Sequence, residues 1–188
     1  MNRRDALSRV ALLLGGTIIG ADAFLSGCKT TPKKEGLFAT DDIALLDEVG
    51  ETILPTTATS PGAKATQIGQ FMKTIVTDCY EPNDQQIFTD GIGKLNDATK
   101  KKYDKDFMSL DATQKHDLLV QLDNEAKNYQ KSKKETDPTH YFSMMKQLTL
   151  WGYFTSEPGA TKALRYVAVP GRYEGCIPYK KGDKAWAT

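Results

Sequence analysis

The segment from Asp137 to Thr155 constrains the fold most, because its apolar face is too wide for a helix that lies on a surface. Asp137 followed by Pro138 is typical of a helix start, since aspartate caps a helix and proline is tolerated in its first turn. The apolar residues that follow are Tyr141, Phe142, Met144, Met145, Leu148, Leu150 and Trp151. A helix that is apolar over so wide an arc packs against several neighbours. The segment therefore predicts the central helix of a helical domain.

Four other helices are indicated ahead of it by apolar residues three to four positions apart. They are expected over Ile43 to Ile53, Ala65 to Cys79, Ile87 to Leu95 and Ala112 to Tyr129. Asp41 or Asp42 is predicted to cap the first helix, and Asp111 with Gln114 forms a capping box at the fourth. No stretch of the sequence alternates like a strand over a useful length. The predicted fold class is all-α, an irregular bundle of five or six helices with an extended C-terminal tail wrapped across it.

Two further segments are expected to have little regular structure. The segment from Thr56 to Ala63 is rich in Thr, Ser, Pro and Gly, which predicts a loop whose hydroxyls make turns and caps. After the central helix, Ser156 is predicted to cap a short helix, and the helical period is then lost beyond Tyr166. Pro170-Gly171 signals a turn into the tail.

The N-terminal residues have the features of an export signal, so they are kept out of the fold. Arg3 and Arg4 resemble a twin-arginine signal. The apolar stretch that follows, residues 10–21, is shorter than the roughly 20 residues that span a bilayer. Leu25-Ser26-Gly27-Cys28 then matches a lipobox, which predicts a lipid on Cys28. The expected organisation is a signal peptide over 1–27, a lipidated tether over 28–40 and a helical domain over 41–188.

The charge of the chain argues against nucleic acid as a partner. Without residues 1–27 it keeps 22 basic and 22 acidic residues, so no basic excess would attract phosphates. Phosphate-binding glycine loops, CxxCH and HExxH motifs are missing from the sequence. His116 and His140 stand apart and are interpreted as surface residues. We therefore expect no catalytic, cofactor-binding or metal-binding residue in this chain.

The cysteines divide into one lipidation site and one pair. With Cys28 lipidated, Cys79 and Cys176 remain, and an exported protein permits their oxidation. A Cys79–Cys176 disulfide would hold the tail against the bundle, and this pairing is the prediction. Two buried free thiols are the alternative.

Several local strings are similar to those of the gluconate 2-dehydrogenase subunit 3 family. They are ETILPTTATSPGAKA, the triplet Asp78-Cys79-Tyr80, LWGYFTSEPGATKALRY and VPGRYEGC. The resemblance covers about Leu45 to Trp186. Members of that family are small non-catalytic subunits that accompany a flavin-dependent oxidoreductase of the glucose-methanol-choline type, often with a cytochrome c subunit. The resemblance implies FAD in the partner subunit and haem c in a third subunit where present. The twin-arginine signal and the lipobox predict a lipid-anchored location on the periplasmic side of a bacterial membrane.

Aromatic residues near the C-terminus are the expected contact with such a partner, since aromatics are enriched at interface cores. The predicted interface is Trp151, Tyr153, Phe154, Tyr166 and Tyr173. Burial in the internal core is the alternative for these rings. The alternative function is a free-standing periplasmic ligand-binding lipoprotein, which an apolar cavity of ligand size would favour. An enzyme in its own right is the third possibility, and no motif supports it.

Overall fold

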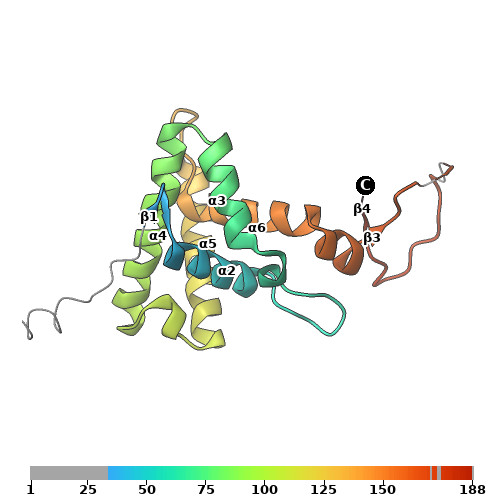
Figure 1. Cartoon of the computed structure of the whole chain (residues 1–188), viewed down its shortest axis with the longest axis horizontal. Helices are drawn as coiled ribbons and strands as arrows, with labels where there is room; N and C mark the ends of the chain where they lie inside the picture. The colour runs from blue at the N-terminus through green and yellow to red at the C-terminus, as the bar shows by residue number, and fades with distance from the viewer. Residues whose placement is uncertain (1–33, 170, 173–174, 188) are drawn as a thin grey trace, which may run out of the picture. The chain divides into compact units, whose positions relative to one another are not determined.

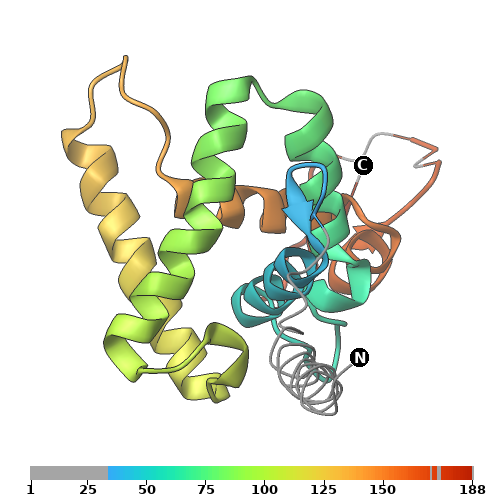
Figure 2. The ribbon, with the colours of Figure 1, turned by 60° about the vertical axis from the view of Figure 1, so that its left-hand side comes forward.

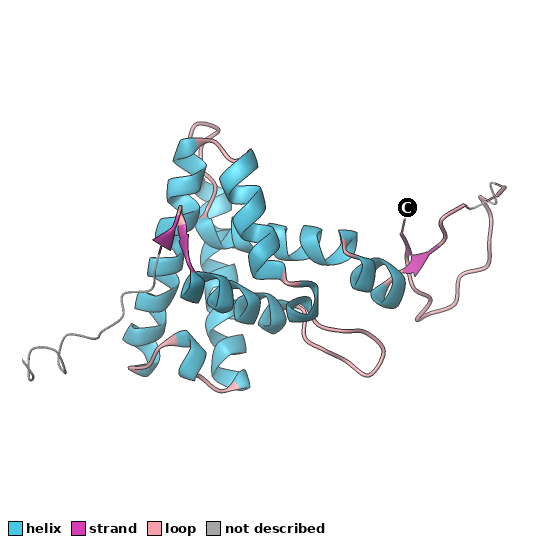
Figure 3. Cartoon of the chain, in the orientation of Figure 1, coloured by secondary structure: helices cyan, strands magenta, loops and turns pink. Residues whose placement is uncertain are grey.

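The structure of the chain is a computed structural model that describes residues 34–169, 171–172 and 175–187. The chain divides into the units Met1–Lys33 and Lys34–Thr188, and all described residues belong to the second. The helices are α2 (Thr40–Ile53), η1 (Ala63–Thr66), α3 (Ile68–Cys79), α4 (Pro82–Tyr103), η2 (Phe107–Ser109), α5 (Ala112–Ser132), α6 (Tyr141–Thr155) and η3 (Gly159–Ala163). The strands have two residues each: β1 (Lys34–Glu35), β2 (Phe38–Ala39), β3 (Arg165–Tyr166) and β4 (Trp186–Ala187). The predicted all-α class is confirmed (Figure 3).

Helix α6 is the central helix, as the sequence predicts. It contacts α2, α3, α4 and α5, and it lies crosswise to α4 and α5 in both Figure 1 and Figure 2. Its buried residues are Tyr141, Phe142, Met144, Met145, Leu148, Thr149, Gly152 and Tyr153. Gly152 lets α3 approach closely, because a Cβ at this position would lie 2.5 Å from Ile68 Cδ1 and from Phe71 Cδ1. The wide apolar face is therefore covered from several sides.

Most apolar residues that the sequence predicts to face the core are buried in the bundle. Helix α5 buries Leu118, Leu119, Leu122 and Ala126, all of which the spacing predicts. Its capping box also forms, since Asp111 Oδ1 accepts from the Gln114 N–H at 2.8 Å and Gln114 Oε1 accepts from the Asp111 N–H at 3.3 Å. The cap predicted for the first helix is displaced. Ala39 precedes the first turn of α2, and Asp42 Oδ2 reaches back to accept its N–H at 2.8 Å.

The start of α6 also differs from the prediction. Asp137 Oδ2 accepts the Lys134 N–H at 2.8 Å and so shapes the preceding loop. The helix begins at Tyr141, where Nδ1 of His140 accepts the Phe142 N–H at 3.3 Å. His140 is half-buried beside the rings of Tyr129 and Tyr141, with centroids 5.6 and 4.6 Å away. It is therefore a helix cap and not the surface residue that was expected.

Burial lowers the pKa of His140 from the usual 6.5, while Glu125 raises it and Lys94 lowers it further. An Nδ1 that accepts a hydrogen bond carries no proton, so protonation at this atom removes the cap. A histidine whose pKa is lowered on folding contributes stability that is complete above the unfolded value, here about 6.5, and is lost as the pH falls through the folded pKa.

We expect the free energy of unfolding to fall by about 1 kcal/mol, a typical cap contribution, between about pH 7.5 and about pH 5.5. His140→Asn retains an acceptor that does not titrate, so this variant should lose less over the same range. Urea unfolding of both proteins at the two pH values measures the difference. The same pH dependence in the variant and the parent would contradict the role of His140.

The C-terminal segment folds back on itself instead of wrapping across the bundle, which corrects the prediction. Every described residue from 165 to 186 is exposed. Strands β3 and β4 pair in parallel, with Arg165 opposite Trp186, and the Arg165 N–H donates to Ala185 O at 2.8 Å. This backbone pairing joins the two ends of the segment to each other (Figure 1). The side chains that the structure describes between these ends are exposed and lie outside the core.

The predicted disulfide is not formed. Cys79 and Cys176 are both free thiols and both exposed. Cys79 is the last residue of α3, one turn beyond Val76, the final buried residue of that helix. Cys176 belongs to the exposed segment, so it is not packed over the bundle as the pairing requires.

Among the described helices, none combines the length and the apolar character needed to cross a bilayer.

Candidate functional site

The side of α6 that faces away from the core carries three exposed apolar residues. Leu150, Trp151 and Phe154 keep 37%, 51% and 37% of their surface exposed. Positions i, i+1 and i+4 fall within an arc of about 100° around a helix, so the three residues lie on one side of α6, named here the α6 outer face. Phe71 of α3 packs edge-on against Trp151, with ring centroids 5.5 Å apart. The Trp151 ring is therefore held in place although half of it meets solvent.

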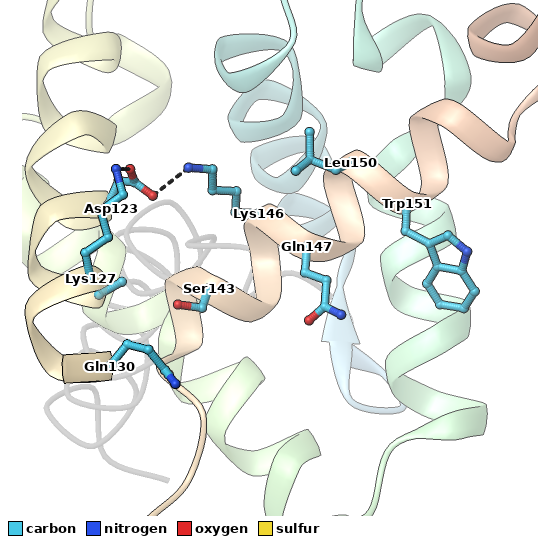
Figure 4. Close-up of a pocket in the computed structure, with 9 residues that line it drawn as sticks. Asp123, Lys127, Gln130, Ser143, Lys146, Gln147, Leu150 and Trp151 are labelled. Carbon is cyan, nitrogen blue, oxygen red and sulfur yellow. Dashed lines mark hydrogen bonds and ion pairs between the residues drawn. The ribbon is translucent and has the colours of Figure 1, made fainter. Parts of the chain in front are cut away.

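The α6 outer face continues into an open groove between α5 and α6, named here the α5–α6 groove (Figure 4). The groove has a volume of about 580 Å³. Its lining includes Ala126, Gln130, Ser143, Gln147, Leu150 and Trp151. The apolar patch thus borders a concave surface with amide and hydroxyl groups, which is the usual composition of a binding surface.

Charged residues also line this groove. Asp123 of α5 accepts a hydrogen bond from Lys146 Nζ of α6 at 2.6 Å and pairs with Lys127 at 2.7 Å (Figure 4). Hydrogen bonds from Lys127 and from Lys146 lower the pKa of Asp123. Asp123 is therefore held as a carboxylate at neutral pH, which makes it a link between α5 and α6 and a poor general acid. In the part of the chain that the structure describes, no group of three His, Cys, Asp or Glu side chains could hold a metal ion.

Tyr153 is internal, which removes it from the predicted interface. It is 3% exposed, and its hydroxyl donates to Pro61 O at 2.6 Å. The same hydroxyl lies 2.5 Å from Ser60 Oγ, in a hydrogen bond that either oxygen can donate. Glu51 holds the same loop, since its carboxylate accepts the Thr56 N–H at 2.9 Å and the Lys64 N–H at 3.0 Å. Tyr153 and Glu51 thus position the loop of residues 56–61.

A second open groove lies between this loop and η3. It has a volume of about 490 Å³, and its lining includes Thr57, Thr59, Pro61, Glu157, Thr161 and Lys162. The turn that leads into η3 forms as the sequence predicts, because Ser156 Oγ accepts the Gly159 N–H at 3.2 Å. Threonine hydroxyls of the loop serve the turn, as expected: Thr57 Oγ1 donates to Ser60 O at 3.3 Å.

The other residues expected at the site are distributed differently. Trp151 and Phe154 lie on the α6 outer face, whereas Tyr166 is 52% exposed on β3. Arg3, Arg4, Cys28 and Tyr173 lie outside the described residues. Leu150 and Phe71 were not predicted as site residues. Leu150 could have been identified from its helical spacing to Phe154. Phe71 could not, because its contact with Trp151 joins two helices and leaves no local pattern in the sequence.

A family model described as gluconate 2-dehydrogenase subunit 3 matches residues 40–171. The matched span contains the α6 outer face and both grooves, and it stops short of Trp186, the expected end of the resemblance. No curated protein and no solved structure matches the chain.

Proposed function

Because the chain belongs to the gluconate 2-dehydrogenase subunit 3 family, we propose that it is the non-catalytic small subunit of a membrane-associated, FAD-dependent sugar or sugar-acid dehydrogenase complex. The family itself supports an accessory role in a gluconate dehydrogenase complex. The finer proposal is that this chain exports, assembles and anchors a catalytic subunit of the glucose-methanol-choline type. FAD then belongs to that subunit, and haem c to a cytochrome c subunit where the complex contains one.

The observation that carries the proposal is the half-exposed Trp151. A tryptophan held by a neighbouring ring, next to a concave polar surface, is typical of the anchors that dominate binding at interfaces. Its pairing with Phe71 limits the side-chain freedom that is lost when a partner binds. We place the catalytic subunit on the α6 outer face, with its side chains entering the α5–α6 groove.

The N-terminal expectations complete the proposal. Residues 1–27 act as a twin-arginine signal, and Cys28 carries the lipid. The expected tether of residues 28–40 is shortened, because the folded unit begins at Lys34 and Phe38 is already buried in the core. The twin-arginine route exports folded proteins, which suits a flavoprotein that must acquire FAD in the cytoplasm. The complex would then stand on the periplasmic side of the membrane.

Removal of the signal tests the escort role. In a strain whose copy carries Arg3→Lys and Arg4→Lys, or lacks this chain, we expect the flavoprotein to stay in the cytoplasm and periplasmic dye-linked dehydrogenase activity to be lost. Cell fractionation and activity staining measure both effects, and a wild-type copy supplied in trans is the control. Cys28→Ala should instead leave an uncleaved precursor, so the same fractions report lipidation separately. Normal export and activity without this chain would refute the escort role.

A free-standing periplasmic ligand-binding lipoprotein is the second candidate. The α5–α6 groove favours it in one respect, since about 580 Å³ suffices for a small ligand. The groove is open rather than enclosed, and two of its lining residues are lysines, which suits contact with a protein surface better. An unaffected flavoprotein in the deletion strain would bring this candidate forward.

A further inference from the structure

The C-terminal segment of residues 165–187, named here the tail, carries a charge opposite to that of the helical bundle. Its sequence contains five basic and two acidic residues, whereas residues 34–164 contain fifteen basic and twenty acidic residues. The tail also exposes large apolar side chains: Tyr166 (52%), Val169 (81%), Ile177 (44%), Tyr179 (76%) and Trp186 (50%). Basic and aromatic residues are thus concentrated in one exposed segment.

A tight turn presents part of this set to solvent. The Asp183 N–H donates to Lys180 O at 2.9 Å, and Asp183 Oδ2 accepts the Lys180 N–H at 2.9 Å. Gly182 has φ +98°, a conformation that glycine adopts without strain. The Asp183 carboxylate is therefore used by the backbone. Within the described residues, neither Lys180 nor Lys181 has an ion-pair partner, so both ammonium groups remain available beside Tyr179.

The base of the tail is closed by contacts of its own. The Arg165 guanidinium lies 3.8 Å from the centroid of the Trp186 ring, and Lys184 Nζ donates to Lys162 O of η3. The β3–β4 pairing joins the same two ends. The tail is thus a loop whose ends are held together, and its described apolar residues between them are exposed.

We infer that the tail binds the surface of an anionic lipid bilayer. Tyrosine and tryptophan favour the headgroup region, and lysine and arginine are attracted to anionic lipids. A uniformly negative surface would attract the tail and repel the acidic bundle, so the charge separation also sets an orientation. The inference uses residues 165–187, most of which lie beyond the family match that ends at residue 171, and it depends on neither the lipid at Cys28 nor the catalytic subunit.

Trp186 offers a local readout of this contact. The chain has two tryptophans, so Trp151→Phe leaves Trp186 as the single emitter. The test uses the purified full chain with Trp151→Phe and Cys28→Ala, mixed with vesicles of phosphatidylglycerol or of phosphatidylcholine. We expect phosphatidylglycerol to shift the Trp186 emission to the blue, brominated phosphatidylglycerol to quench it, and about 0.5 M salt to suppress both effects. Phosphatidylcholine should leave the emission unchanged.

A pair of lysine variants in the same background provides the matched comparison. Lys180→Ala with Lys181→Ala should weaken vesicle binding at least about ten-fold. Lys101→Ala with Lys102→Ala removes two adjacent exposed lysines from the last turn of α4 and should leave binding unchanged. An emission that phosphatidylglycerol does not move, or an equal loss in both variants, would overturn the inference. The inference would also be overturned if the tail variant no longer bound the flavoprotein and vesicles did not change the Trp186 emission. The tail would then be a contact with protein.

Discussion

Replacing Trp151 with alanine is expected to weaken binding of the flavin-dependent subunit about thirty-fold, which corresponds to about 2 kcal/mol. The reason is the position of the ring, half exposed on the α6 outer face and held by Phe71. A docked partner would bury the rest of this ring together with Leu150 and Phe154. Titration of the purified catalytic subunit against the two proteins, followed by interferometry, gives the change in Kd.

Met108→Ala is the control for this prediction. Met108 lies on η2 and is 48% exposed, close to the 51% of Trp151. Its loss should leave binding of the partner unchanged. Thermal unfolding of both variants checks that each remains folded, because a half-exposed side chain contributes less to the core than a buried one. Unaltered affinity of a folded Trp151→Ala protein would place the partner elsewhere on the molecule.

Gly69→Ala is expected to lower the free energy of unfolding by about 3 kcal/mol. Gly69 of α3 lies against α2, because a Cβ there would lie 2.3 Å from the backbone oxygen of Ile43. That oxygen belongs to α2, so it cannot move without disturbing the helix. The Gly69 N–H also donates to Asp47 Oδ1 at 2.8 Å, and this bond would lengthen if the two helices separated.

Gly93→Ala is the matched control, because it makes the same chemical change within another helix. A Cβ at Gly93 of α4 has no atom within 4 Å. The higher helix propensity of alanine should therefore stabilise this variant by about 0.5 to 1 kcal/mol. Urea unfolding of both proteins isolates the cost of helix packing as the difference between them. Equal stability of the two variants would show that α2 and α3 do not approach so closely.

Most of the helices could be predicted from the sequence because their causes are local. The Asp111–Gln114 capping box and the apolar spacing from Leu118 to Ala126 lie within one helix, and both are found in α5. The prediction that Asp137 caps α6 was wrong because that choice is not local. Asp137 and His140 are both able to accept a hydrogen bond from the backbone, and the choice between them depends on the packing of Tyr129 and Tyr141 around His140.

The division of the aromatic residues between core and surface could not be predicted in the same way. Tyr153 lies two positions after Trp151, on the opposite side of α6, and a helix that is apolar all round does not indicate which side faces out. The loop of residues 56–61 decides this, because Ser60 and Pro61 meet the Tyr153 hydroxyl from more than ninety positions away. The position of the tail likewise decides that Cys79 and Cys176 are free thiols. An even number of cysteines in the sequence does not indicate where the tail lies.

The sequence by itself determined the helical class, the central position of α6 and the resemblance to the family. These properties follow from the order and spacing of residues within single segments, which nearest-neighbour backbone and side-chain interactions govern. The tertiary structure alone decided that Trp151 is exposed with Phe71 beside it, that Tyr153 is internal, and that the tail closes on itself through Arg165 and Trp186. Each of these depends on contacts between segments distant in the chain, and such contacts leave no periodic trace in the sequence.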